Sequence, residues 1–189
     1  ESMDTYDLFA ACSTVRQFLD VLTNWYIRRS RDRFWSGDQD AIDTLHTVLH
    51  LLSQIAAPLL PLLTDEIYRG LNGDDSASVH LTDWPTSSAL PKDSALVASM
   101  DLVREVCSSA LSVRKAHSRR VRLPLSSLTV ACADAATLEG FLDIVRDEVN
   151  VRDVVLTTDV DAVASRELQV VPAVVGPRLG AHTQAVIVA

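Results

Sequence analysis

Glycine, proline and aromatic residues are scarce in this chain of 189 residues. It contains six glycines and seven prolines, and aromatic residues make up 5% of it. All-β sandwiches and barrels need many tight turns, which glycine and proline usually form. A turn-dense all-β fold is therefore excluded, and we expect a mainly helical protein.

Cysteine is also rare, and its spacing excludes a structural zinc site. Cys12, Cys107 and Cys132 lie far apart, and no pair has the short spacing of zinc ligands. We expect three reduced thiols that act as small buried apolar residues, as suits a cytoplasmic protein.

Positive charge is outnumbered across the chain. Lysine and arginine number 17 against 25 aspartates and glutamates, which gives a net charge of −8. Non-specific binding to polyanions such as DNA is therefore disfavoured, and any contact with nucleic acid has to be local.

Familiar catalytic and cofactor motifs are missing from the sequence. There is no GxSxG, no phosphate-binding GxxxxGK[ST] and no GxGxxG. His46 and His50 stand one helical turn apart, but Thr47 replaces the glutamate of HExxH. Asp65 and Glu66 fit the first turn of a helix better than acid–base catalysis. We expect no metal, no cofactor and no catalytic residue in this chain.

A window of 21 residues, 44–64, contains no charged side chain and has the length of a membrane span. His50, Pro58 and Pro61 interrupt it, and only 12 of its residues are apolar. We therefore expect a helix buried on most sides, and no membrane partner.

Apolar periodicity predicts an all-helical first part and a mixed second part. Residues with helical spacing cover about 6–35, 40–59, 61–71 and 94–117, and 79–85 reads as extended. We expect Leu45, Leu52, Val103 and Ala110 in the core. After Pro124, short apolar runs alternate with a helical stretch over 128–132, 137–148, 151–157 and 166–175. The predicted organisation is a helical bundle over 1–123 and a small α/β subdomain over 124–189.

The basic residues gather in two clusters that hold nine of the 17. The first cluster is Arg28, Arg29, Arg31 and Arg33; the second is Arg114, Lys115, Arg119, Arg120 and Arg122. Arginine suits bidentate binding to phosphate or carboxylate. Cations are also favoured at the C-terminal ends of helices, where both clusters are predicted to lie, and salt bridges need the same chemistry.

Four sequence segments, in this order, carry a family resemblance. They are Asn24–Trp35 (NWYIRRSRDRFW), Ala57–Pro61 leading to Asp65–Tyr68, Ser78–Pro85 (SVHLTDWP) and Val121–Leu125. Together they resemble the anticodon-binding helical domain of isoleucyl-tRNA synthetases, closely over about 6–130 and weakly to the end.

The resemblance implies a mainly α fold, an antiparallel helical bundle of the class I synthetase anticodon-binding type followed by a small α/β subdomain. It implies a region that binds the anticodon arm of tRNA(Ile), with the two basic clusters as RNA-binding candidates. The catalytic domain of the same parent chain would then carry out ATP-dependent aminoacylation in the cytoplasm. The family's ATP signatures, HIGH and KMSKS, are absent from the sequence. On its own the chain is therefore not expected to be an enzyme, and ATP belongs to the parent.

Two alternatives remain at this point. The equivalent domain of a valyl or leucyl enzyme shares the bundle, and a helical protein-interaction module would use its arginines on acids of a partner. We rank the second cluster above the first as the RNA-facing one. Trp25, Tyr26, Phe34 and Trp35 are expected to pack rather than stack on bases, and His80 and Trp84 are expected to be structural.

Overall fold

The computed structural model describes residues 2–86 and 90–161, together with 177 and 180. These residues are mainly helical, with one small parallel sheet. The chain divides into two compact units, residues 1–91 and 92–189, each of which is described by itself. The predicted strand at 166–175 lies outside the described residues.

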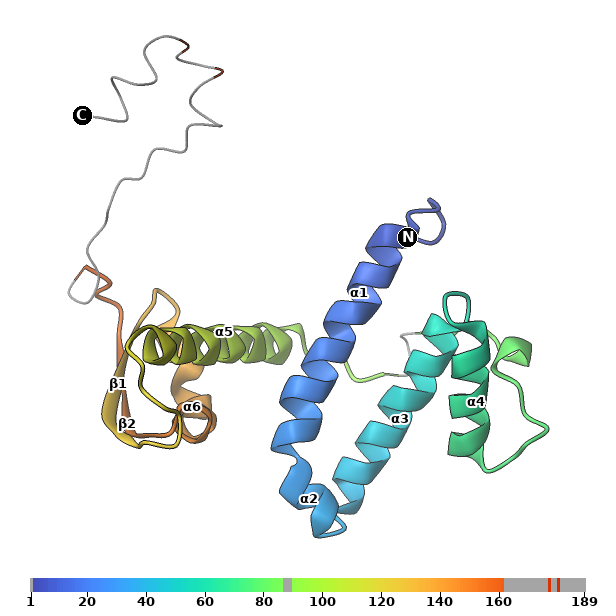
Figure 1. Cartoon of the computed structure of the whole chain (residues 1–189), viewed down its shortest axis with the longest axis horizontal. Coiled ribbons are helices and arrows are strands. Elements are labelled where there is room, and N and C mark those ends of the chain that lie inside the picture. Colours follow the sequence, from blue (N-terminus) through green and yellow to red (C-terminus); the bar gives the residue numbers. More distant parts are fainter. Residues whose placement is uncertain (1, 87–89, 162–176, 178–179, 181–189) are drawn as a thin grey trace. The chain divides into compact units, whose positions relative to one another are not determined.

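The first unit begins with a long, interrupted helical segment (Figure 1). Helix α1, Leu8–Val21, continues through a π-helical stretch, Leu22–Ile27, into the short helix α2, Arg31–Trp35. The predicted single helix over 6–35 is therefore interrupted, because Ser30 leaves helical geometry with φ −86° and ψ 6°.

Helix α3, Gln39–Ala56, returns beside α1, and α4, Pro61–Asn72, packs on α3 (Figure 1). The side chain of Asp38 caps α3 by accepting from the Ala41 N–H at 3.2 Å. Pro61 occupies the first turn of α4, where its missing N–H costs nothing, and Gly73 ends the helix with φ 63°.

The segment after α4 begins with a turn, whereas residues 79–85 are expected from the sequence to be extended. Val79–Leu81 forms a 3-10 turn, and the Ser78 hydroxyl accepts from the His80 N–H. Asp65 of α4 accepts from Ser78 Oγ at 2.8 Å and from the Val79 N–H at 3.0 Å. This contact between segments 13 residues apart sets the turn, so local sequence does not reveal it.

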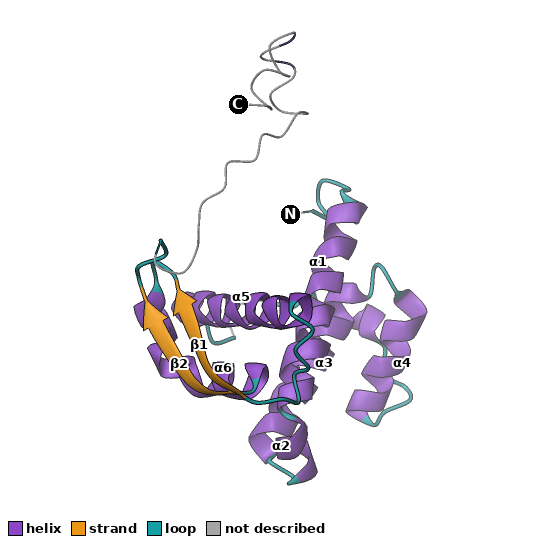
Figure 2. Ribbon diagram, turned by 60° about the vertical axis from the view of Figure 1, so that its left-hand side comes forward, coloured by secondary structure: helices purple, strands orange, loops and turns teal. Residues whose placement is uncertain are grey.

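The second unit packs one long helix beside a β-α-β element (Figure 2). Helix α5, Ser94–Ala116, agrees closely with its prediction. Strands β1, Leu125–Ala131, and β2, Val151–Thr157, pair in parallel, with Leu125 opposite Val151. A 3-10 stretch, Ala135–Phe141, and helix α6, Leu142–Val149, connect them. The small α/β element predicted from the sequence is present as this motif.

The largest fully buried side chains lie in the second unit. Val103 and Leu138 are 0% exposed, and Val145 and Val149 are 1% exposed. The core predictions for Val103 and Ala110 are confirmed, because both are buried. Val103 and Ala110 both lie on α5, which packs on α6 and on the 3-10 stretch before α6.

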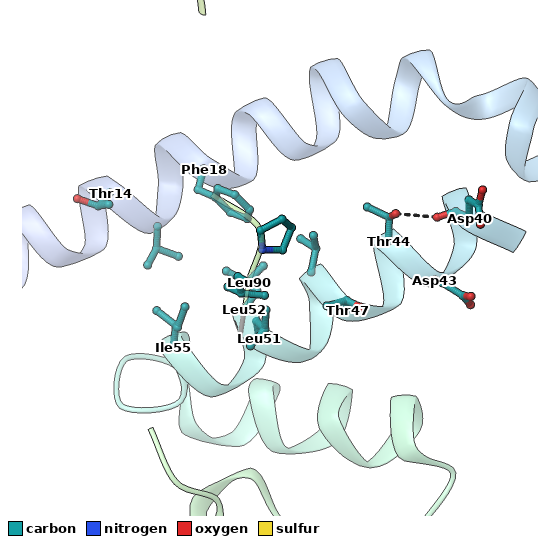
Figure 3. A pocket seen from close by; sticks show the side chains of 13 residues that line it. Thr14, Phe18, Asp40, Asp43, Thr44, Thr47, Leu51, Leu52, Ile55 and Leu90 are labelled. Carbon is teal, nitrogen blue, oxygen red and sulfur yellow. Dashed lines mark hydrogen bonds between the residues drawn. The ribbon is translucent and has the colours of Figure 1, made fainter. Parts of the chain in front are cut away.

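The core predictions for Leu45 and Leu52 are wrong, since both side chains are only half-buried. Leu52 lines an open apolar groove of about 880 Å³ between α1 and α3 (Figure 3). Leu52 and Ile55, which belong to the apolar stripe predicted for this helix, both line the groove.

The cysteine prediction holds in part. Cys107 is buried, Cys132 is half-buried and Cys12 is exposed, and none of the three is part of a disulfide. Among the described residues, no helix combines the length and hydropathy needed to cross a membrane.

Candidate nucleic-acid interface

The second basic cluster lies on the last turn of α5 and on the loop after it; we call residues 115–122 the basic loop. The helix ends at Ala116, and Ser118 takes a left-handed conformation with φ 53°. The Arg119 N–H then donates to the Arg114 carbonyl at 2.8 Å. This tight reversal places the loop directly after the C-terminal end of α5, where the helix dipole favours positive charge.

Arg114 belongs to the interior and not to the surface of this cluster. It is 4% exposed, and its Nη2 donates to the carbonyl oxygens of Arg120, at 2.7 Å, Val121, at 3.3 Å, and Leu123. A guanidinium turned inward to three carbonyls presents no N–H to a phosphate. Of the five residues predicted to bind RNA in this cluster, Arg114 is thus the buried one, and its hydrogen bonds go to the loop backbone.

The other four members of the cluster are exposed. None of them forms an ion pair with a residue in the described ranges 2–86 and 90–161. They are Lys115, Arg119, Arg120 and Arg122. Asp101 of α5 does not compensate them, because it pairs with Arg104 within its own helix. The loop therefore displays several positive charges on a chain whose net charge is −8.

Asn150 holds the basic loop from its other side. This residue ends α6 in the left-handed conformation, with φ 55°, and its Nδ2 donates to the Val121 carbonyl at 2.7 Å. Its own carbonyl accepts from the Leu125 N–H at 3.2 Å, at the start of β1. Sequence reasoning missed Asn150; the available signal was an asparagine between a helical and a β-branched run, a favourable left-handed position.

In the first cluster, Arg33 is engaged locally. Its Nε lies 2.7 Å from Asp38 Oδ2, and its side chain is half-exposed. The hydrogen bond from Arg33, together with the Ala41 N–H, holds the pKa of Asp38 below its usual value. This pair closes the turn between α2 and α3, so Arg33 is already used in folding.

Arg28 and Arg29 also make contacts within their own helical segment. Arg28 Nε donates to the Asn24 carbonyl at 2.7 Å, and the Arg29 guanidinium lies 5.4 Å from the centre of the Trp25 ring. Arg31 is exposed. The two clusters fall in different units, and the first is the more strongly engaged in local structure.

The aromatic residues of the first cluster divide into packed and exposed ones. Tyr26 and Phe34 meet edge to face at 6.3 Å, and the Tyr26 hydroxyl donates to the Ala41 carbonyl at 3.3 Å. Trp25 is half-buried, whereas Trp35 is 79% exposed. The packing prediction is therefore confirmed for Trp25, Tyr26 and Phe34 and is wrong for Trp35.

His80 and Trp84 flank the turn that follows α4. His80 Nε2 lies 3.0 Å from the Pro61 carbonyl and so joins the turn to the start of α4. Trp84 is 58% exposed, with part of its surface facing a small cavity beside α1 and α3. The structural role predicted for His80 is confirmed, while Trp84 is only partly packed.

Asp65 and the histidine pair make local contacts within the first unit. Asp65 is held by Ser78, Val79 and Arg69, whose Nη2 lies 2.6 Å from its carboxylate; the Ser78 hydrogen bond is the main cause of its lowered pKa. His46 and His50 stack at 6.3 Å. Within the described part of the chain, no group of three or more histidine, cysteine or acidic side chains is placed to bind a metal.

The groove between α1 and α3 has the wrong chemistry for phosphate. Phe18, Leu51, Leu52 and Ile55 point into it, together with Leu90 (Figure 3). Its polar end carries the carboxylates of Asp40 and Asp43, and the Thr44 hydroxyl donates to the Asp40 carbonyl at 2.6 Å. An apolar groove with acids at one end repels a polyanion, so the candidate interface is the basic loop.

Comparison with known proteins gives one family and a consistent set of relatives. Residues 1–129 match the family described as the anticodon-binding domain of tRNA ligase. The isoleucine–tRNA ligases of Nocardia farcinica and Mycobacterium tuberculosis are each 55% identical over 187 residues, 99% of this chain. That of Leifsonia xyli is 50% identical over 191 residues, 98% of this chain. The chain spans only 17 to 18% of the length of these relatives. A family match over more than half of the chain, with this level of identity, shows that the chain belongs to the anticodon-binding domain family of tRNA ligases, in the form found in isoleucine–tRNA ligases.

Proposed function

We propose that this chain binds the anticodon arm of tRNA(Ile) and positions it for ATP-dependent aminoacylation by a catalytic domain elsewhere in a longer ligase. The basic loop makes the phosphate contacts in this proposal. The observation that carries it is the exposure of Lys115, Arg119, Arg120 and Arg122 without ion pairs to the described residues.

Phosphate binding suits these side chains because arginine offers a planar fork of N–H donors. An RNA-binding surface also needs rigid placement, since phosphate contacts fix the register of the RNA relative to the protein. The hydrogen bonds from Arg114 and Asn150 to the loop carbonyls supply that rigidity. Base recognition would take place on the unstacked anticodon nucleotides, as is usual for RNA loops.

The finer architecture forms part of the same proposal. We propose an antiparallel bundle over residues 1–123, with 124–189 as the start of a C-terminal α/β region. The partners are tRNA(Ile) and the catalytic domain of the same parent chain, in the cytoplasm. ATP would be used by that catalytic domain, and we assign no residue of this chain to it. The names of the curated relatives favour isoleucine over the valyl or leucyl alternative.

The test is a double substitution, Arg119→Ala with Arg120→Ala, in the complete ligase. We expect a higher KM for tRNA and a flatter salt dependence, each lost phosphate contact lowering the logarithmic slope by roughly 0.7 to 0.9. Isoleucine activation without tRNA should not change. The matched control is Arg16→Ala with Arg146→Ala, which removes the same charge outside both clusters. An unchanged KM and slope in the test variant, or an equal effect in the control, would refute the role of the loop.

A second function is favoured for the first cluster by the exposure of Trp35, 79%, beside the Arg33–Asp38 pair. Tryptophan and arginine are enriched where protein interfaces gain most of their binding energy. Under this alternative, the α2 end of the first unit contacts another part of the ligase and not RNA. Trp35→Ala would then lower the stability of the complete ligase while leaving the salt slope of tRNA binding unchanged. A flattened slope would instead assign the cluster to RNA.

A further inference from the structure

Arg114 has an unusual environment for a charged residue. It is 4% exposed, and it has no ion pair among the described residues. Its Nε and Nη1 are buried without a hydrogen-bond partner in the described part of the chain, so the side chain donates to these residues through Nη2. Burying a charge is costly unless polar groups compensate it. Here the compensation comes from carbonyl oxygens of the basic loop.

The hydrogen bonds of Arg114 fix the direction of the loop backbone. They reach the carbonyls of residues 120, 121 and 123, while the Arg114 carbonyl accepts from the Arg119 N–H. One residue is thus bonded to four positions of the segment that follows it. With these carbonyls turned inward, the side chains of Arg119, Arg120 and Arg122 are exposed to solvent.

We propose that Arg114 is a positioning residue for tRNA binding: it holds the basic loop in its RNA-binding conformation without contacting RNA. This inference rests on the proposed function of the loop. A loop that is already ordered does not have to be ordered on binding, so a larger share of its contact energy appears as affinity. Loss of Arg114 should therefore weaken tRNA binding although all four exposed cations remain.

Arginine is better suited to this role than lysine. Its planar group carries several N–H donors in a fixed geometry, whereas the lysine ammonium is a point charge on a flexible stem. Asn150, which donates to the carbonyl of Val121 at 2.7 Å, holds the same loop independently of Arg114. Its left-handed backbone, φ 55°, is one that glycine also adopts, so Asn150→Gly removes the amide with little strain.

The experiment compares Arg114→Met, Arg114→Lys and Asn150→Gly in the complete ligase, with the Arg119→Ala, Arg120→Ala double variant as reference. The measurements are KM for tRNA at about 50 and 200 mM salt, isoleucine-dependent pyrophosphate exchange, and hydrogen exchange of the loop amides. The ratio of the KM at 200 mM salt to the KM at 50 mM salt measures the salt dependence. Each lost phosphate contact makes this ratio about threefold smaller.

For Arg114→Met we expect the salt dependence of KM to fall by the equivalent of one or two phosphate contacts, about threefold to tenfold. Hydrogen exchange of the loop amides should become faster, and isoleucine-dependent pyrophosphate exchange should stay unchanged. Arg114→Lys should recover part of the loss, and Asn150→Gly should show a smaller loss in the same direction. If Arg114→Met is insoluble, the other two variants decide, and tRNA binding equal to wild type in both would overturn the proposal.

The inference fails alone if Arg114→Met leaves KM and salt slope unchanged while the double variant alters both. If neither variant alters them, the proposed function of the basic loop fails as well. A loss of thermal stability in Arg114→Met with normal tRNA binding would assign Arg114 to folding only and overturn the positioning role.

Discussion

Truncating two leucines to alanine tests whether the groove between α1 and α3 is open in solution. Leu138 is 0% exposed and lies on the 3-10 stretch that contacts α5, α6 and β2, so protein surrounds it on all sides. Leu138→Ala removes buried carbons and leaves a cavity, which should cost about 2 to 5 kcal/mol of unfolding free energy. Leu52 is half-buried against the groove.

The expected cost of Leu52→Ala is smaller for two reasons. Full burial of a leucine side chain contributes about 1.5 to 3 kcal/mol, so half-burial contributes about 1 kcal/mol. No new cavity term arises, because the space next to Leu52 is already open. We therefore expect about 1 kcal/mol for Leu52→Ala, against at least twice that value for Leu138→Ala.

The positions of the aromatic residues allow the unfolding of the two units to be measured separately by urea titration. Trp25, Trp35 and Trp84 all lie in residues 1–91, and the second unit contains no tryptophan or tyrosine. Tryptophan fluorescence therefore follows the first unit and Leu52→Ala, whereas far-ultraviolet circular dichroism detects both units and Leu138→Ala. Equal costs for the two variants would show that Leu52 is fully enclosed in solution and refute the open groove. A cost below roughly 1 kcal/mol for Leu138→Ala would refute the core assignment.

Two further predictions join those made for Arg119, Arg120 and Arg114. The chain alone should show no isoleucine-dependent pyrophosphate exchange, because the HIGH and KMSKS signatures are absent; exchange above background in the purified chain would contradict this. Asp65→Asn should destabilise the protein at neutral pH but progressively less in acid. The Ser78 hydrogen bond lowers the pKa of Asp65 below 3.8, so its stabilisation is present above that pH and is lost as the pH falls through the folded-state pKa. Thermal melts of both proteins check this, and a constant difference in Tm down to low pH would rule it out.

Elements with strong local patterns were predictable from the sequence. The prediction of a helix over 94–117 compares with α5 at Ser94–Ala116, and the β-branched run 151–157 is β2. The interruption near Ser30 was not predictable, because no glycine or proline marks it: residues 28–33 are arginine, serine and aspartate only. The 3-10 turn at Val79–Leu81 depends on Asp65, 13 or more residues earlier, which no local pattern contains.

The candidate site was predictable in composition but not in geometry. Clustering and residue type identified the basic loop and its exposed cations. The burial of Arg114 was not visible, because the rule for helical neighbours considers side chains three or four residues apart on one helix. Arg114 instead bonds backbone carbonyls after a left-handed reversal at Ser118, and a periodic pattern does not describe such a reversal.

The groove of about 880 Å³ also affects how a common test of foldedness should be read for this protein. Dyes such as anilinonaphthalene sulfonate fluoresce on accessible apolar surface, and their binding is often taken as a sign of a molten globule. Here Phe18 and Ile55 are 46% and 41% exposed in the folded chain, so we expect dye binding by a native state with fixed tertiary structure. Near-ultraviolet circular dichroism from the tryptophans and a cooperative melt would distinguish this native signal from a loss of packing. Dye fluorescence alone should therefore not be used to reject a variant of this domain as misfolded.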